Sequence, residues 1–100
     1  MNACLILAHN EEEFIEKNVL DVITLFDLVI VINDGSKDNT GEILKNLDYE
    51  NLKIITNRRN LGAGKSLEIG INEFKNSTCD NLIKIDGDGQ FKLKDIMSLE

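Results

Sequence analysis

Two aspartates, Asp86 and Asp88, end a short apolar run near the C-terminal end of the sequence. In extended backbone, residues i and i+2 project to the same side, so both carboxylates are expected to face one hard divalent cation. Mg²⁺ or Mn²⁺ held by one or two carboxylates keeps further coordination positions for phosphate oxygens. Gly87 and Gly89 allow the backbone to turn sharply beside a ligand. In isolation, such a segment is more often a plain polar turn after a strand.

Three other polar segments follow apolar runs in the same way. They occupy residues 9–13, 33–38 and 57–62. The carboxyl ends of parallel strands share one edge of the sheet, and open α/β sheets bind ligands at that edge. The segments expected at the opposite edge, around 25–27 and 48–51, carry nothing comparable. The agreement of four segments therefore favours a ligand site over four unrelated turns.

The hydrophobic pattern predicts the elements that position these segments. Strands are predicted at residues 3–8, 28–32, 52–56 and 82–85, and helices over about 14–23, 40–47, 63–74 and 93–99. This alternation indicates an α/β fold, a three-layer open parallel sheet with Rossmann-like alternation and about four strands. We expect Asn10 to cap the first helix with Glu13 in a capping box, and one of Asp38, Asn39 or Thr40 to cap the second.

Composition narrows the class of protein. The 100 residues amount to one domain or part of one, and a net charge of −7 argues against binding a nucleic-acid duplex. A nucleotide is not excluded, because a divalent metal reverses the local charge. No apolar run approaches the length of a membrane span, and the chain lacks the charged lead of a signal peptide. Cys4 and Cys79 have no metal-ligand spacing and fit a reducing cytoplasm.

The segments after the first two strands are expected to bind a nucleotide. Asp34 at a strand end can accept hydrogen bonds from ribose hydroxyls or a base N–H, and Ser36 can donate to a ligand. Asn10 and Glu11 lie nearest the end of the first strand and are placed in the same site, with His9 in its wall. The simpler interpretation is a tight turn after the second strand and a first helical turn with acidic residues favoured by the helix dipole.

Residues 60–66 resemble a P-loop, in which Gly-Lys-Ser precedes a helix. That motif requires a glycine where this chain has Arg59, whose side chain disfavours the phosphate cradle. The apolar run that ends at Asp86 imitates the accompanying strand, so a P-loop nucleotidase stays open as an alternative. Otherwise Gly62 and Gly64 allow close packing of helix on sheet and expose amides at the helix N-terminus, where Lys65 can add positive charge.

Two other uses of an Asp-x-Asp segment agree less well with the sequence. A calcium loop that begins at Asp86 would need glycine at Phe91 and glutamate at Met97. An aspartyl-phosphate phosphatase would usually carry the pair after its first strand, with Thr or Val at the position of Gln90.

Taken in order, four motifs resemble the family 2 glycosyltransferases, which have the GT-A fold. The motifs span residues 8–12, 33–40, 60–64 and 86–90. This resemblance implies transfer of a sugar, with inversion, from a nucleotide-diphosphate donor such as a UDP- or GDP-sugar. Gln90, two residues after the second aspartate, is most similar to the branch that glycosylates polyprenyl or dolichyl phosphate. Leu7 and Asn33 depart from the family pattern, which often has proline and aspartate there.

The resemblance implies a role for each matched residue. Asp86 and Asp88, with Gln90, would hold the Mg²⁺ or Mn²⁺ that bridges the donor diphosphate, and Asp88 is thereby the catalytic residue. Asp34 would contact base or ribose. The residues assigned to nucleotide-sugar binding are Ala8, Asn10, Glu11, Asp34, Gly35, Ser36, Asn60, Gly62, Gly64, Asp86 and Gly87.

In this family the acceptor site and the general base follow the metal loop. Residues 1–100 are therefore expected to be a single domain, the donor-binding part of a longer glycosyltransferase with little turnover by itself. The acceptor is expected to be a polyprenyl phosphate or a glycan, reached from the cytoplasm or at the membrane surface. An open sheet edge would favour self-association. A non-catalytic nucleotide-binding fragment stays open as a third hypothesis.

Overall fold

Strands and helices alternate along the chain in the computed structural model, which describes residues 1–85 and 97–99. The elements are β1 (Asn2–Ala8), α1 (Ile15–Val22), β2 (Leu28–Asp34), α2 (Thr40–Lys45), β3 (Leu52–Asn57), α3 (Ala63–Lys75), β4 (Asn81–Ile85) and β5 (Met97–Leu99). The first four strands are parallel. The predicted α/β class is thus confirmed.

The sheet has the order β3-β2-β1-β4-β5, with β1 in the middle. The register pairs Ala8 with Asn33 and Asp34 with Asn57, so β1, β2 and β3 end at one edge. The chain moves outward from β1 to β3 and then returns to the other side of β1 as β4. This change of direction beside β1 is the topological feature at which open α/β sheets bind ligands.

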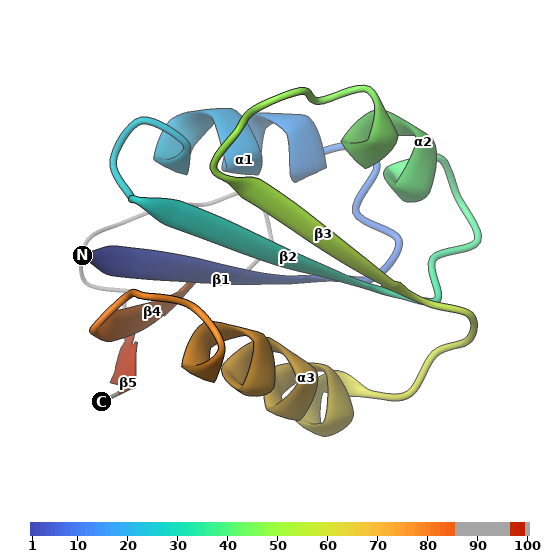
Figure 1. The fold of residues 1–100 in the computed structure, drawn as a ribbon. Coiled ribbons are helices and arrows are strands. Elements are labelled where there is room, and N and C mark those ends of the chain that lie inside the picture. Colours follow the sequence, from blue (N-terminus) through green and yellow to red (C-terminus); the bar gives the residue numbers. More distant parts are fainter. Residues whose placement is uncertain (86–96, 100) are drawn as a thin grey trace.

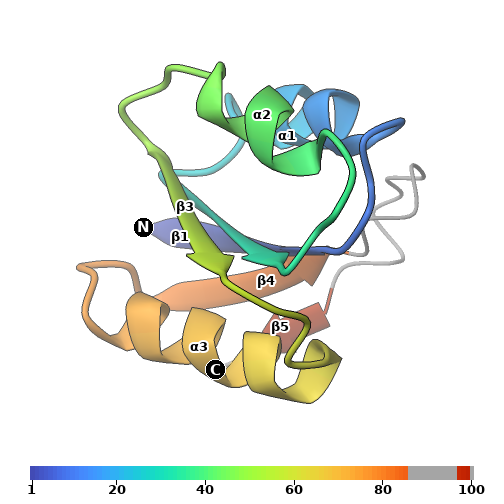
Figure 2. The same cartoon turned by 90° about the vertical axis from the view of Figure 1, so that its right-hand side faces the viewer.

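Helices cover both faces of the sheet. Figures 1 and 2 show α1 and α2 on one face and α3 on the other. Alternate residues of β1 serve the two cores: Cys4 and Ile6 pack on the α1–α2 side, and Leu5 packs on the α3 side. The strands are continuous apolar runs because both faces are buried, as parallel sheets require. The predicted three-layer arrangement is confirmed.

Helix α3 comes very close to the sheet at Gly70. A Cβ atom at this position would lie 2.5 Å from Leu5 Cδ1, well inside van der Waals contact. An alanine here would require the buried Leu5 side chain to shift, so the lack of a side chain at Gly70 lets α3 pack close to β1.

The predicted cap of the first helix is wrong. Helix α1 begins at Ile15, and its N-cap residue Phe14 makes no side-chain capping bond. Asn10 instead adopts a left-handed conformation with φ +53° and takes part in a loop. At α2 the N-cap residue is Asn39, one of the three predicted, and it makes no side-chain capping bond. Asp38 Oδ1, one residue earlier, accepts the amide and the hydroxyl of Thr40 at 2.9 and 2.6 Å.

The predicted helix over 93–99 is wrong at its C-terminal end. Met97–Leu99 forms strand β5, antiparallel to β4. Short apolar runs do not distinguish helix from strand by periodicity, and the outer side of β4 offers backbone partners that satisfy these amides. Residues 93–96 lie outside the described part of the chain.

Strand β3 lies at the other edge of the sheet. Within the described residues, no strand pairs with its outer side, so the expected open edge is present. Lys53 on this strand forms an ion pair with Glu73 of α3. Charged side chains on edge strands discourage pairing with another chain. Self-association through this edge stays a prediction.

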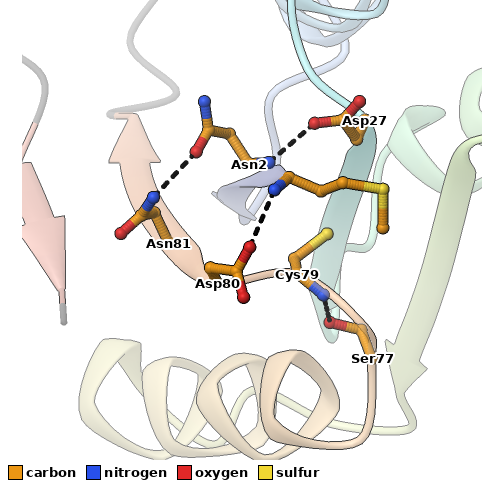
Figure 3. Close-up of polar contacts among 7 residues, drawn as sticks. Asn2, Asp27, Ser77, Cys79, Asp80 and Asn81 are labelled. Atoms are coloured by element: carbon orange, nitrogen blue, oxygen red, sulfur yellow. Dashed lines mark hydrogen bonds and ion pairs between the residues drawn. The ribbon is translucent and has the colours of Figure 1, made fainter.

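At the amino edge of the sheet, exposed polar contacts tie the strands together (Figure 3). The amide of Asn2 donates to Asp27 Oδ2 at 2.7 Å, and Asn81 Nδ2 donates to Asn2 Oδ1 at 3.0 Å. The amino group of Met1 pairs with Asp80 at 2.9 Å.

Cys4 is fully buried, and burial raises the pKa of its thiol to about 12. It therefore stays protonated at neutral pH and acts as a small core residue. In the described ranges, no helix is both long and apolar enough to cross a lipid bilayer.

Candidate functional site

A pocket of about 300 Å³ opens at the carboxyl edge of the sheet. Three segments form it: the end of β1 with the loop after it, the end of β2, and the loop that joins β3 to α3 with the first turn of α3. Its lining residues are Leu7, Ala8, His9, Glu11, Asp34, Asn60, Gly62, Ala63 and Ser66. The pocket thus lies where the polar segments of the sequence were expected to meet.

Asp34 is the most constrained side chain of this pocket. Its carboxylate accepts the amides of Leu61 and Gly62 at 2.7 and 2.9 Å and the side-chain amide of Asn57 at 3.0 Å. Only 4% of the residue is exposed. The carboxylate at the end of β2 therefore holds the turn that leads into α3.

Burial opposes ionisation of Asp34, but the hydrogen bonds outweigh it. The amides of Leu61 and Gly62, with Asn57 and the hydroxyl of Ser66, favour the charged form and hold the pKa of the Asp34 carboxyl below its ordinary value. The group is therefore an anion at neutral pH.

His9 connects the ends of β1, β2 and β3. Its Nδ1 lies 2.6 Å from the carbonyl oxygen of Asp34, and since a carbonyl only accepts, we assign the proton to Nδ1. In the neutral ring, Nε2 then accepts from the side-chain amides of Asn10 and Asn60, at 3.3 and 3.5 Å. His9 forms part of the pocket wall, as predicted.

The loops after β1 and β2 are joined by hydrogen bonds from backbone to side chain. The amide of Asn10 donates to Ser36 Oγ at 2.9 Å, and the amide of Lys37 donates to Asn10 Oδ1 at 2.8 Å. The amide of Glu11 donates to Thr40 Oγ1 at 2.8 Å. Asn10 and Ser36 thus form hydrogen bonds with each other's loops, and neither lines the pocket.

Asp38 and Glu12 extend this connection. The amide of Glu12 donates to Asp38 Oδ2, and the amide of Asn39 donates to Glu12 Oε2, both at 3.2 Å. Burial opposes the charge on Asp38, but hydrogen bonds, chiefly from Thr40, lower the pKa of its carboxyl. The α1–α2 side of the site is therefore a crosslinked support.

Gly35 serves packing between loops. Its φ is +62°, and a Cβ atom would lie 2.2 Å from the backbone of Arg59 and Asn60. Gly62, with φ +94°, lines the pocket and has open space around it. Gly64 lies in the first turn of α3, outside the lining residues.

Charge divides across this edge. Glu11, Glu12, Glu13 and Asp38 lie on the α1–α2 side. Arg58 and Arg59 follow β3, are exposed, and make no ion pair within the described residues. Two of the positive charges at this edge thus lie on the loop that leads into α3, and Lys37 adds one on the loop after β2.

Five residues predicted for nucleotide-sugar binding line the pocket: Ala8, Glu11, Asp34, Asn60 and Gly62. Leu7, Ala63 and Ser66 were missed. Ser66 stood inside the P-loop-like segment, but nothing in its spacing marked it as a pocket residue. Asp86, Gly87, Asp88 and Gln90 lie outside the described residues, so the structure leaves the predicted metal ligands as a prediction. Elsewhere in the described chain, no group of three His, Cys, Asp or Glu side chains could hold a metal.

A second hollow of about 480 Å³ opens at the amino edge. Its lining includes Asp27, Glu50 and Cys79 and none of the motif residues. Because open α/β sheets bind ligands at the carboxyl ends of their strands, the smaller pocket is the better candidate site.

Comparison with known proteins agrees with this geometry. The model of the family described as "Glycosyl transferase family 2" matches residues 3–99. The chain belongs to this family. The family predicted from the four motifs is thereby confirmed, and with it the GT-A type of α/β fold.

Several curated relatives are similar over much of the chain. An uncharacterized protein of Methanocaldococcus jannaschii is 36% identical over 95% of this chain and 43% of its own length. A UDP-N-acetylglucosamine–dolichyl-phosphate N-acetylglucosaminyltransferase of Methanococcus voltae is 33% identical over 92% of the chain and 43% of its length. A dolichyl-phosphate β-glucosyltransferase of Trichomonas vaginalis is 32% identical over 72% and 21%. The chain thus spans less than half the length of these relatives.

Proposed function

We propose that the chain is the donor-binding part of a metal-dependent, inverting glycosyltransferase that takes a nucleotide-diphosphate sugar. One observation carries the proposal: a family 2 chain forms a pocket at the carboxyl edge from five residues that its motifs had singled out. Ala8, Glu11, Asp34, Asn60 and Gly62 come from three separate segments of the chain, and the fold brings them together.

The charge distribution supports an anionic ligand with a defined orientation. The loop that leads from β3 into α3 supplies Arg58 and Arg59, which make no ion pair within the described residues, while acidic residues lie on the opposite side. Cationic side chains and helix N-termini attract phosphate groups. We therefore place the donor diphosphate toward α3.

The predicted metal ligands suit the chemistry. Two carboxylates and an amide oxygen, from Asp86, Asp88 and Gln90, are the hard donors that Mg²⁺ or Mn²⁺ prefers. When bound, such an ion stabilises the negative charge that develops on the leaving nucleoside diphosphate. Asp34, Asn60 and the loop amides would orient the nucleotide while the acceptor oxygen attacks the anomeric carbon from the opposite side, which inverts its configuration.

A lipid-linked phosphate is the acceptor we propose. Two of the relatives are named for transfer to dolichyl phosphate. A phosphate oxygen is already anionic and needs little help from a general base, whereas a glycan hydroxyl would need a carboxylate to take its proton. Such a reaction would take place at the membrane surface, on the cytoplasmic side, where the free thiols of Cys4 and Cys79 stay reduced.

Calorimetric titration with UDP-, GDP- and ADP-sugars, with and without Mn²⁺, tests this function. We expect Mn²⁺-dependent binding of one nucleotide class, lost in Asp88→Ala and retained in Lys65→Ala. The reverse pattern would favour the P-loop nucleotidase. Intact binding without sugar transfer, measured in the longer protein, would favour a non-catalytic nucleotide-binding role.

A further inference from the structure

Ser66 is a buried polar residue on the inner face of α3. It has no exposed surface and lies next to Asp34 and Asn57 at the back of the pocket. Alanine would favour the helix more and would need no hydrogen bond when buried. Packing and helix stability therefore do not explain a hydroxyl at position 66, so its role lies in its polar contacts.

The hydroxyl of Ser66 joins the hydrogen-bond network around Asp34. Oδ1 accepts from Asn57 Nδ2 and from the amide of Leu61, and Oδ2 accepts from the amide of Gly62. Asn57 Nδ2 also donates to Ser66 Oγ at 3.3 Å, which leaves the serine proton free to turn toward Asp34, and the hydroxyl favours the charged form of this carboxyl. The three hydrogen bonds use most of the roughly four acceptor positions of a carboxylate, and Asn57 links Ser66 to them.

A carboxylate that accepts several hydrogen bonds is held in one position. Asp34 therefore fixes the loop that joins β3 to α3. The segment that it holds supplies Asn60, Gly62 and Ala63 to the pocket lining. The amide of Gly62 also donates to Asn60 Oδ1 at 3.0 Å, so fixing Gly62 fixes the side chain of Asn60.

We propose that Ser66 is a positioning residue for the nucleotide pocket, which acts through Asp34 and Asn57 on the amides of Leu61 and Gly62. This inference rests on the proposed function for the identity of the ligand. The wall made by the β3–α3 loop is thereby set before the nucleotide arrives, which lowers the cost of ordering it on binding.

The test compares Ser66→Ala with Ser77→Ala. Ser77 is a matched control, because its hydroxyl also makes local hydrogen bonds, to the carbonyl of Phe74 and from the amide of Cys79, but at the opposite edge. Affinity for UDP and GDP with Mn²⁺ is measured by calorimetry. Hydrogen exchange of the Leu61 and Gly62 amides, and the NMR titration of the Asp34 carboxyl carbon, follow the positioning itself.

We expect Ser66→Ala to weaken binding of the preferred nucleotide about three- to tenfold, the effect of one hydrogen bond. Exchange of both amides should be faster and the titration midpoint of Asp34 higher, and Ser77→Ala should change none of these. Ser66→Cys, which keeps the shape with a weaker donor, should lie between Ser66→Ala and wild type.

Unchanged amide exchange and an unchanged Asp34 titration in Ser66→Ala would overturn the proposal. If affinity still fell in that case, Ser66 would be a direct ligand contact. If neither nucleotide bound the wild-type protein, the proposed function would fail, and the exchange and titration data alone would decide whether Ser66 holds the loop.

Discussion

The two edges of the sheet use the same interaction in different surroundings. At the carboxyl edge, the carboxylate of Asp34 accepts the amides of Leu61 and Gly62 and is 4% exposed. At the amino edge, the carboxylate of Asp27 accepts the amide of Asn2 in an exposed position. Water can replace the exposed bond at little cost, but the buried carboxylate of Asp34 has little contact with water. Burial, more than the bond itself, separates a loop that is fixed from a loop that is only tethered.

The largest effect is expected from Asp34→Ala. Three donors, from Asn57, Leu61 and Gly62, would lose a charged acceptor inside the protein. Hydrogen bonds to charged groups contribute roughly 1.5–3 kcal/mol each, not additively, so we expect the free energy of unfolding to fall by about 4 kcal/mol. Urea unfolding measures it. A loss as small as that of Asp27→Ala would remove the distinction between the two edges.

Gly35→Ala should be the next most severe change. The new methyl group would meet the backbone of Arg59 and Asn60 at 2.2 Å in a left-handed conformation. Strain and overpacking together predict a loss of about 3 kcal/mol.

Two glycines nearby are controls for Gly35. The new methyl group of Gly62→Ala meets no atom within 4 Å, so the free energy of unfolding should fall only by the cost of the left-handed backbone, about 1–2 kcal/mol. Gly64→Ala, in the first turn of α3, should be neutral or slightly stabilising. Thermal unfolding of all three variants gives the order. Equal losses in Gly35→Ala and Gly62→Ala would show that loop contact adds nothing to backbone strain.

Acid should loosen the carboxyl edge. The folded pKa values of Asp34 and Asp38 lie below the ordinary value of 3.8. Their contribution is therefore complete above that pH and is lost as the pH falls through the folded values. Unfolding free energy measured between pH 5 and about 2 should fall less steeply in Asp34→Asn than in wild type. Identical slopes would argue that the hydrogen bonds of Asp34 do not depend on its charge.

The smallest effect is expected at the amino edge. Asp27→Asn keeps an oxygen that can accept the amide of Asn2, and the site is exposed. We expect the free energy of unfolding to fall by less than about 1 kcal/mol and the nucleotide affinity to stay unchanged. A loss of affinity would mean that the two edges are coupled through the sheet.

Much of the fold could be predicted because it depends on local pattern. Continuous apolar runs predicted four parallel strands, and the ends of β1, β2 and β3 brought the expected loops together. The strand Met97–Leu99 was predicted as helix because three residues are too few to show a hydrophobic periodicity. Its pairing partner, β4, lies elsewhere in the sequence.

The site was harder to predict than the fold. Asn10 has the residue type and spacing of a helix cap, but hydrogen bonds with Ser36 and Lys37, 26 and 27 residues away, prevail over the local preference. Ser66 could not be recognised because its importance depends on Asp34 and Asn57, which only the folded sheet brings to it. Interactions across the sheet edge decide both cases.

The close approach at Gly70 has a consequence for the pocket. Because Gly70 has no side chain, α3 packs directly on Leu5, and this buried contact helps to set the distance between the helix and the sheet. Ala63 and Ser66 belong to that same rigid rod. We therefore expect substitutions at Gly70 or Leu5 to widen or narrow the opening that receives the ligand, so that selectivity could be retuned by residues that never touch it.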